Sequence, residues 1–123
     1  MGTFSWPMRT ARMSGGRSVD LEATVDTGAF YSALPTPLLR ELGVEPLYRR
    51  KMQLADGRLI DADIGEARVT ISGETVTTLV IFGEDRSPPL LGAYTLEGLA
   101  LAVDPTSQRL IPRVMIMYAQ SAA

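Results

Sequence analysis

The chain has 123 residues, of which 46% are hydrophobic and 21% charged, and its formal net charge is −2. This composition is ordinary for a soluble globular protein, so we expect one domain spanning residues 1–123. The chain contains neither cysteine nor histidine. This excludes disulfides, thiolate metal sites, cysteine nucleophiles and histidine bases. Acid–base chemistry near neutral pH must therefore use carboxylates, tyrosine or the single lysine.

The sequence predicts no nucleic-acid, membrane or metal partner. Its one basic run, Arg49–Lys51, is interpreted as a solvated loop. No secretory signal begins the sequence, and the apolar run Val114–Ala119 is far shorter than the roughly 20 residues that cross a bilayer. Asp61, Asp63 and Glu66 lack the spacing of known calcium loops. We therefore expect a cytoplasmic protein that uses no cofactor.

In chain order, the first predicted elements are two strands and a helix. Phe4–Met13 and Val19–Val25 flank a Ser-Gly-Gly turn signal, and the second strand alternates apolar and polar residues. We expect a hairpin with Pro7 at a sheet edge, because proline cannot donate to a β-ladder. Thr36–Leu42 has a proline in its first turn and a glycine just past its end, which predicts a short helix.

The remaining segments alternate strands and turns, with one further helix. An Asp56–Gly57 turn interrupts Met52–Asp63 and predicts a hairpin. Three strands and a helix complete the series, at Glu66–Ile71, Thr75–Phe82, Ala93–Leu99 (helix) and Ala100–Val103. Short strands separated by frequent turn signals predict an all-β fold with one or two short helices, built as a small closed barrel or a sandwich.

The motif that carries chemistry stands at the end of the alternating strand, where Val25 is followed by Asp26, Thr27, Gly28 and Ala29. A carboxylate that leaves a buried strand into a turn of small residues can be presented to a cleft. Taken alone, the tripeptide also suits an ordinary turn, with aspartate accepting backbone N–H bonds and glycine supplying positive φ.

The context of this motif resembles a known family. Val25–Pro35 and Pro88–Gly92 resemble the two signature stretches of retropepsin-type aspartic proteases, which include bacterial single-domain members. In that family a hairpin flap lies about halfway along the chain, where Asp56–Gly57 stands here. Two apolar residues and a glycine precede a short helix, as Leu90–Gly92 does here. The resemblance implies a small closed β-barrel of the acid-protease type, with one lobe per chain.

The resemblance also implies residue roles. Asp26 would be the catalytic carboxylate, Thr27 would tie two active-site loops together, and Gly28 would let the loop approach substrate. The implied substrate-binding residues are Ala29, Leu54, Asp56, Gly57, Leu59, Ile60 and Leu90. Phe30 departs from the family, which commonly has a polar or charged residue there, so a contact to the substrate backbone would be lost.

The single Asp-Thr-Gly motif predicts a homodimer. Only Asp26 is followed by Thr-Gly or Ser-Gly, so one chain supplies half of a catalytic pair, and a two-fold axis would bring the other half from an identical subunit. The function this predicts is an aspartic endopeptidase that acts on polypeptides through a water activated by two aspartates.

The sequence leaves several alternatives open. The protein could be a dimeric peptide-binding module of the same fold without useful turnover, or an unrelated β-barrel in which Asp26 closes a turn. Phe4–Met8 and Val114–Tyr118 are candidate dimer strands, although the second could equally be an ordinary internal strand. The turn at Asp56–Gly57 could be a moving lid or a plain hairpin turn.

Overall fold

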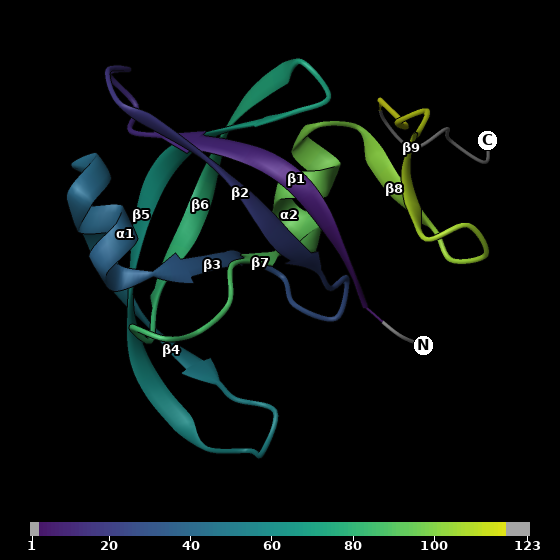
Figure 1. Ribbon diagram of the computed structural model, residues 1–123. Coiled ribbons are helices and arrows are strands. Elements are labelled where there is room, and N and C mark those ends of the chain that lie inside the picture. The colour runs from purple at the N-terminus through teal and green to yellow at the C-terminus, as the bar shows by residue number, and fades with distance from the viewer. Residues whose placement is uncertain (1–2, 118–123) are drawn as a thin grey trace, which may run out of the picture.

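The computed structural model describes residues 3–117, which fold into nine strands and two helices (Figure 1). In chain order the elements are β1 (Phe4–Ala11), β2 (Ser18–Val25), β3 (Ser32–Pro35), α1 (Thr36–Leu42), β4 (Pro46–Gln53), β5 (Leu59–Ile71), β6 (Glu74–Gly83), β7 (Leu90–Leu91), α2 (Ala93–Gly98), β8 (Leu101–Asp104) and β9 (Arg109–Pro112).

Six of these strands close into a ring in the order β1-β2-β7-β3-β6-β5. The ring closes because residues 9–11 of β1 pair with residues 68–70 of β5, while the whole of β1 pairs with β2. Strand β4 extends the sheet outward from β5, and β8 and β9 form a separate two-stranded sheet. The predicted all-β closed barrel is therefore confirmed, and the alternative of a sandwich is wrong.

The β1–β2 hairpin shows why this segment folds as predicted. Ala23 and Val25 of β2 are buried, whereas Asp20 and Glu22 are exposed, so one face of the strand lines the core. Pro7 pairs with β2 but lies outside the part of β1 that pairs with β5. Its other side therefore has no partner among the described strands, which confirms the predicted edge position.

Both predicted helices are present. Helix α1 ends at Leu42 and is capped by Gly43, whose φ of 86° suits a residue without a side chain. Its Leu39 and Leu42 are buried against the barrel. Helix α2 ends at Gly98, one residue earlier than predicted, and buries Thr95. No helix within residues 3–117 is long and apolar enough to cross a membrane.

The basic run differs from its prediction, because residues 49–51 belong to strand β4 and not to a loop. The β4–β5 register places Arg49 opposite Asp63 and Lys51 opposite Asp61. The ion pairs measure 3.0 Å and 3.4 Å between nitrogen and oxygen. Opposite charges directly across an antiparallel pair favour the strand, and this pairing could not be inferred from the run alone.

The internal strand considered for Val114–Tyr118 is wrong for the part that the structure describes. Residues 114–117 contain no strand, and Val114, Ile116 and Met117 are almost fully exposed. Tyr118 lies outside the described residues. An apolar run forms a strand only where a neighbour pairs with it, and residues 3–117 supply none there. Its role as a dimer strand stays a prediction.

Candidate active site

The segment 26–31, which we call the Asp26 loop, joins β2 to β3. It begins with a tight turn, because the amide of Ala29 donates to the carbonyl of Asp26 at 3.1 Å. The amide of Gly28 donates to Oδ1 of Asp26 at 2.9 Å. Asp26 is half-buried and Thr27 is exposed. The turn therefore orients one carboxylate oxygen through the backbone of its own loop.

Gly28 is held close to this carboxylate. A Cβ atom at this position would lie 3.1 Å from Oδ1 of Asp26. Such a contact is tighter than ordinary van der Waals packing, so a larger residue would displace the carboxylate or the turn. Absence of a side chain at position 28 thus leaves room for this hydrogen bond.

The second signature stretch pairs with the strand that leads to the Asp26 loop. Strand β7 runs parallel to the end of β2, with Thr24 opposite Leu90 and Val25 opposite Leu91. The amide of Asp26 donates to the carbonyl of Leu91 at 3.0 Å. Leu90, a predicted substrate-binding residue, therefore stands opposite Thr24, two residues before the carboxylate.

Helix α2 holds the far end of the Asp26 loop. Its first amides have no partner within the helix, and those of Ala93 and Tyr94 donate to the carbonyls of Ala29 and Phe30 at 2.9 Å and 2.8 Å. Gly92 permits this approach, because a Cβ there would lie within 2.9 Å of backbone atoms of the loop. The loop is thus fixed at both ends by the segment 90–94.

A buried chain of hydroxyls, which was not predicted from the sequence, lies behind the loop. Oγ of Ser32 accepts from the amide of Gly92 at 3.0 Å and lies 2.6 Å from Oγ1 of Thr95. Thr95 in turn lies 2.8 Å from Oγ1 of Thr78. All three hydroxyl residues are at most 2% exposed. A signal was available, since Ser32 shares its face of the strand with Leu34, and Thr78 lies between Val76 and Val80 on the inward face of β6.

The other predicted substrate-binding residues lie on the β4–β5 hairpin, which projects from the barrel (Figure 1). Leu54, Asp56 and Gly57 form its turn, and the amide of Gly57 donates to the carbonyl of Leu54 at 2.9 Å. The amide and guanidinium of Arg58 donate to the Asp56 carboxylate, which lowers the pKa of Asp56 below its ordinary value of 3.8. The predicted tight turn is confirmed.

The two apolar residues after this turn point to opposite faces of the hairpin. Ile60 pairs with Met52 and shares its face with the buried Ala62. Leu59 faces the other way and is 62% exposed, against 37% for Ile60. Among the described residues no hydrogen bond or ion pair joins the hairpin to the Asp26 loop, so the predicted site residues form two separate groups.

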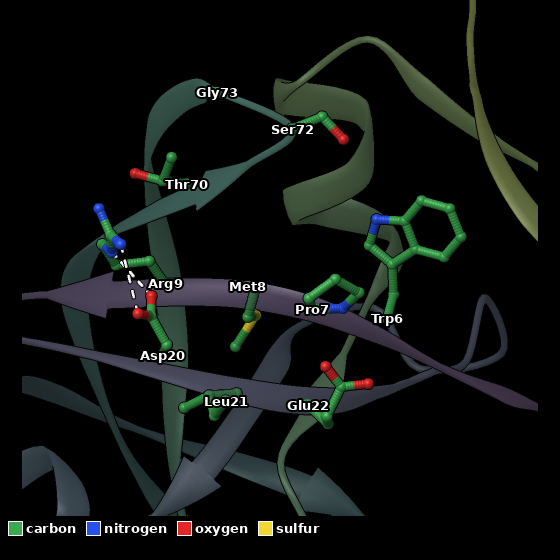
Figure 2. Close-up of a pocket in the computed structure, with 10 residues that line it drawn as sticks. All are labelled: Trp6, Pro7, Met8, Arg9, Asp20, Leu21, Glu22, Thr70, Ser72 and Gly73. Carbon is green, nitrogen blue, oxygen red and sulfur yellow. Dashed lines mark hydrogen bonds and ion pairs between the residues drawn. The ribbon is translucent and has the colours of Figure 1, made fainter.

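A depression on the surface belongs to neither group. It has a volume of about 550 Å³ and lies over β1, β2 and the β5–β6 turn, with Trp6 and Ser72 among the residues that line it (Figure 2). None of its lining residues comes from the Asp26 loop. Within residues 3–117, no group of three acidic residues is placed to hold a metal ion.

A family model described as aspartyl protease matches residues 10–95, which is more than two thirds of the chain. The chain belongs to the aspartyl protease family. It is accordingly an aspartic-type peptidase, and the resemblance stated from its two signature stretches is confirmed. A comparison with curated proteins gives no significant match.

Solved structures share the fold of this aspartyl protease. It is 22% identical to EIAV protease solved with an inhibitor, with a TM-score of 0.55 and coverage of 80% of this chain and 88% of the other. It is 18% identical to simian foamy virus (mac) protease, with a TM-score of 0.53 and coverage of 76% and 93%. It is 24% identical to a retropepsin-like aspartic protease from Rickettsia conorii, with a TM-score of 0.53 and coverage of 85% and 86%. The predicted retropepsin-type fold is therefore confirmed.

Proposed function

We propose that this aspartyl protease is a homodimeric endopeptidase in which Asp26 of each subunit supplies one carboxylate of the catalytic pair. We also propose that residues 1–123 act as one domain, one lobe per chain. The observation that carries the proposal is the half-buried Asp26 in a loop bonded at both ends to β7 and α2. The sequence offers no second Asp-Thr-Gly or Asp-Ser-Gly.

The chemistry follows from two carboxylates held close together. They cannot both ionise readily, so they share one proton and titrate as a pair. The ionised carboxylate accepts a proton from water as the water attacks the peptide carbonyl, while the protonated one donates to the carbonyl oxygen. The resulting gem-diol collapses when the now protonated carboxyl gives its proton to the amide nitrogen, the ionised one takes a proton from a hydroxyl of the gem-diol, and the C–N bond breaks; the pair again shares one proton.

A two-fold axis beside the Asp26 loop would complete this pair, because an isologous dimer brings the same residue from each subunit together. Thr27 is exposed beside Asp26, where its hydroxyl is available to the loop of the second subunit. The exposed apolar residues 114–117 supply further surface for the same contact. Both features support the dimer.

We further propose that the substrate is a polypeptide bound as an extended strand between the Asp26 loop and the β4–β5 hairpin. Leu90 and Ala29 would lie beneath the peptide. The hairpin would close over it as a lid, with Ile60 on the side that continues the barrel interior. Leu59 lies on the opposite face of the hairpin, and its contact with peptide stays a prediction.

The decisive experiment compares wild type with Asp26→Asn on a mixed peptide library, with Asp85→Asn in the exposed β6–β7 loop as the matched control. We expect cleavage by wild type and by the control, and none by Asp26→Asn, while sedimentation shows dimers for all three. If no protein cleaves but the dimers retain peptides, the protein is a peptide-binding module. Cleavage that survives in Asp26→Asn overturns the assignment.

A further inference from the structure

The β4–β5 hairpin contains one basic side chain that has no acidic partner among the described residues. Between residues 46 and 65 the sequence has four basic and three acidic side chains. Three ion pairs use all of these side chains but one, namely Arg49–Asp63, Lys51–Asp61 and Arg58–Asp56. The side chain left over is Arg50, which no ion pair within residues 3–117 includes. The hairpin therefore offers one positive charge to a partner from outside.

Arg50 lies on the face of the hairpin that continues the barrel interior. Side chains alternate between the two faces of a sheet along each strand, and the register places Arg50 opposite Ala62. Ala62 is 4% exposed, and Ile64, the next residue on its face, is fully buried. The paired Arg49 faces the other way. Arg50 is thus on the side from which we propose that the hairpin covers a peptide.

The ring of Tyr48 holds the guanidinium of Arg50 in place. The Cζ atom of Arg50 lies 4.1 Å from the centroid of this ring, which is a favourable cation–π distance. Tyr48 precedes Arg50 by two residues in β4, so both side chains share a face. Nη1 of Arg50 also donates to the carbonyl of Arg49 at 3.1 Å. The side chain is therefore ordered before a peptide binds, which lowers the entropic cost of binding.

The remaining N–H groups of Arg50 are available to an acceptor. A guanidinium carries its N–H donors in a planar fork, and the carbonyl of Arg49 is the one acceptor that the fork has among the described residues. The fork matches the two oxygens of a carboxylate, which accepts two parallel hydrogen bonds from it. A positive charge that a closing lid shuts away from water without a partner is costly. A peptide carboxylate at this place removes that cost.

We propose that Arg50 makes this peptidase selective for polypeptides that carry an aspartate or glutamate side chain at one fixed position. This inference rests on the proposed function and names its substrate class. The protein as a whole has a formal net charge of −2, so its overall field favours basic peptides over acidic ones. A preference for acidic peptides must therefore come from a local contact, and Arg50 supplies it.

The size and salt dependence of the effect follow from the exposure of Arg50. Its side chain is exposed in the structure, and ion pairs of this kind change affinity by about two- to fivefold. At an ionic strength of about 1 M the Debye length falls to about 3 Å. The preference for acidic peptides should therefore weaken as salt is added, whereas a preference based on apolar contacts would not.

The test measures peptide selection in two ways, with wild type for cleavage and Asp26→Asn for binding without turnover. In each background Arg50→Gln removes the charge and Arg50→Glu reverses it. The matched control is Arg49→Gln, since Arg49 adjoins Arg50 but lies on the opposite face and pairs with Asp63. The control removes the same charge from the hairpin, so an effect of net charge alone appears in both variants. Both readouts use one peptide library, and sedimentation velocity is recorded for every variant.

We expect aspartate and glutamate to be enriched at one fixed position among the peptides that are cleaved and bound. Arg50→Gln should reduce this enrichment about two- to fivefold, through KM and not kcat, and Arg50→Glu should replace it with enrichment of lysine and arginine. Arg49→Gln should keep the preference for acidic residues. An enrichment that persists in Arg50→Gln or in about 1 M salt overturns the inference. A loss that Arg49→Gln shows equally, or that accompanies dissociation of the dimer, overturns it too.

The two readouts separate this inference from the proposed function. If wild type cleaves nothing while Asp26→Asn still selects acidic peptides in a manner dependent on Arg50, the proposed function fails and the inference holds. If cleavage is normal but no acidic residue is enriched, only the inference fails. If peptides are neither cleaved nor bound, both fail.

Discussion

Replacement of Thr95 by valine tests how the protein holds its Asp26 loop. The substitution keeps the branched shape of the side chain but removes a hydroxyl that lies 2.6 Å from Ser32 Oγ and 2.8 Å from Thr78 Oγ1. Both partners are buried and would lose a hydrogen bond without access to water. Leaving a buried polar group unpaired costs about 1–3 kcal/mol, so we expect Thr95→Val to lower the free energy of unfolding by about that amount.

The effect on activity follows through Gly92. Its amide donates to Ser32, and the next two amides hold the carbonyls of Ala29 and Phe30. A loosened network displaces the Asp26 loop, and small displacements of a catalytic group lower rates on the order of 10- to 100-fold. We expect kcat to fall within this range while KM changes little.

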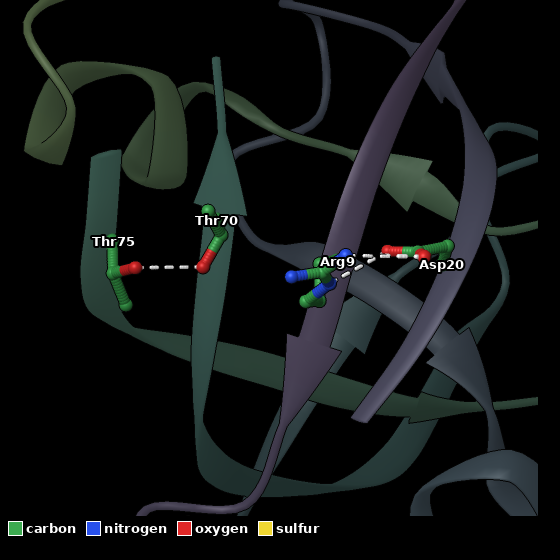
Figure 3. Close-up of polar contacts among 4 residues, drawn as sticks. All are labelled: Arg9, Asp20, Thr70 and Thr75. Atoms are coloured by element: carbon green, nitrogen blue, oxygen red, sulfur yellow. Dashed lines mark hydrogen bonds and ion pairs between the residues drawn. The ribbon is translucent and has the colours of Figure 1, made fainter. Parts of the chain in front are cut away.

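The assays are urea denaturation, peptide cleavage and hydrogen exchange of the amides of residues 93 and 94, which should become faster. Thr75→Val is the matched control, because the exposed hydroxyls of Thr70 and Thr75 form a similar pair at 2.7 Å (Figure 3). Figure 3 also shows the exposed ion pair of Arg9 and Asp20 nearby. We expect the control to change stability by less than about 0.5 kcal/mol. Equal effects of the two substitutions would refute the reasoning.

Three further predictions concern the same framework. Gly28→Ala places a Cβ 3.1 Å from Oδ1 of Asp26; it should abolish most cleavage with little change in denaturation midpoint, and full activity would contradict this. Gly92→Ala forces a Cβ to within 2.6 Å of backbone oxygen in the Asp26 loop; it should destabilise the fold by about 1–3 kcal/mol, and an unchanged urea midpoint would count against the geometry. Hydrogen bonds from Arg58 lower the pKa of Asp56. The ionised Asp56 carboxylate therefore stabilises the hairpin turn at pH values above 3.8, and this stabilisation is lost as the pH falls through the lowered pKa. An NMR titration should place the midpoint of Asp56 below 3.8, and a midpoint above 3.8 would show that these hydrogen bonds do not form.

Local features of the sequence predicted the elements well. Alternation along Val19–Val25 gave β2, and glycine and proline positions gave α1 and the hairpin turn at Asp56–Gly57. These features depend on neighbours close in sequence. A strand with one buried face shows alternating apolar and polar residues, and a turn that needs positive φ favours glycine. The barrel class was predicted from the frequent turn signals between short strands, together with the family resemblance.

Contacts between distant residues were not predictable in the same way. The pairing of Val25 with Leu91 and the bond between Ser32 and Thr95 join segments more than 60 residues apart, and nothing near either residue specifies its partner. Arg49 likewise gave no sign that Asp63 faces it across a strand pair. The apolar residues Val114–Tyr118 predicted a strand, but a strand needs a partner that this chain alone does not supply within residues 3–117.

The distance between the two Asp26 carboxylates tests the proposed catalytic pair most directly. In a crystal structure of the assembled protein, we expect an Asp26 oxygen of one subunit to lie about 2.5–3.0 Å from an Asp26 oxygen of its partner, which is hydrogen-bond distance for a shared proton. A structure in which every contact between subunits leaves the two side chains too far apart to hold one water molecule between them would contradict the account.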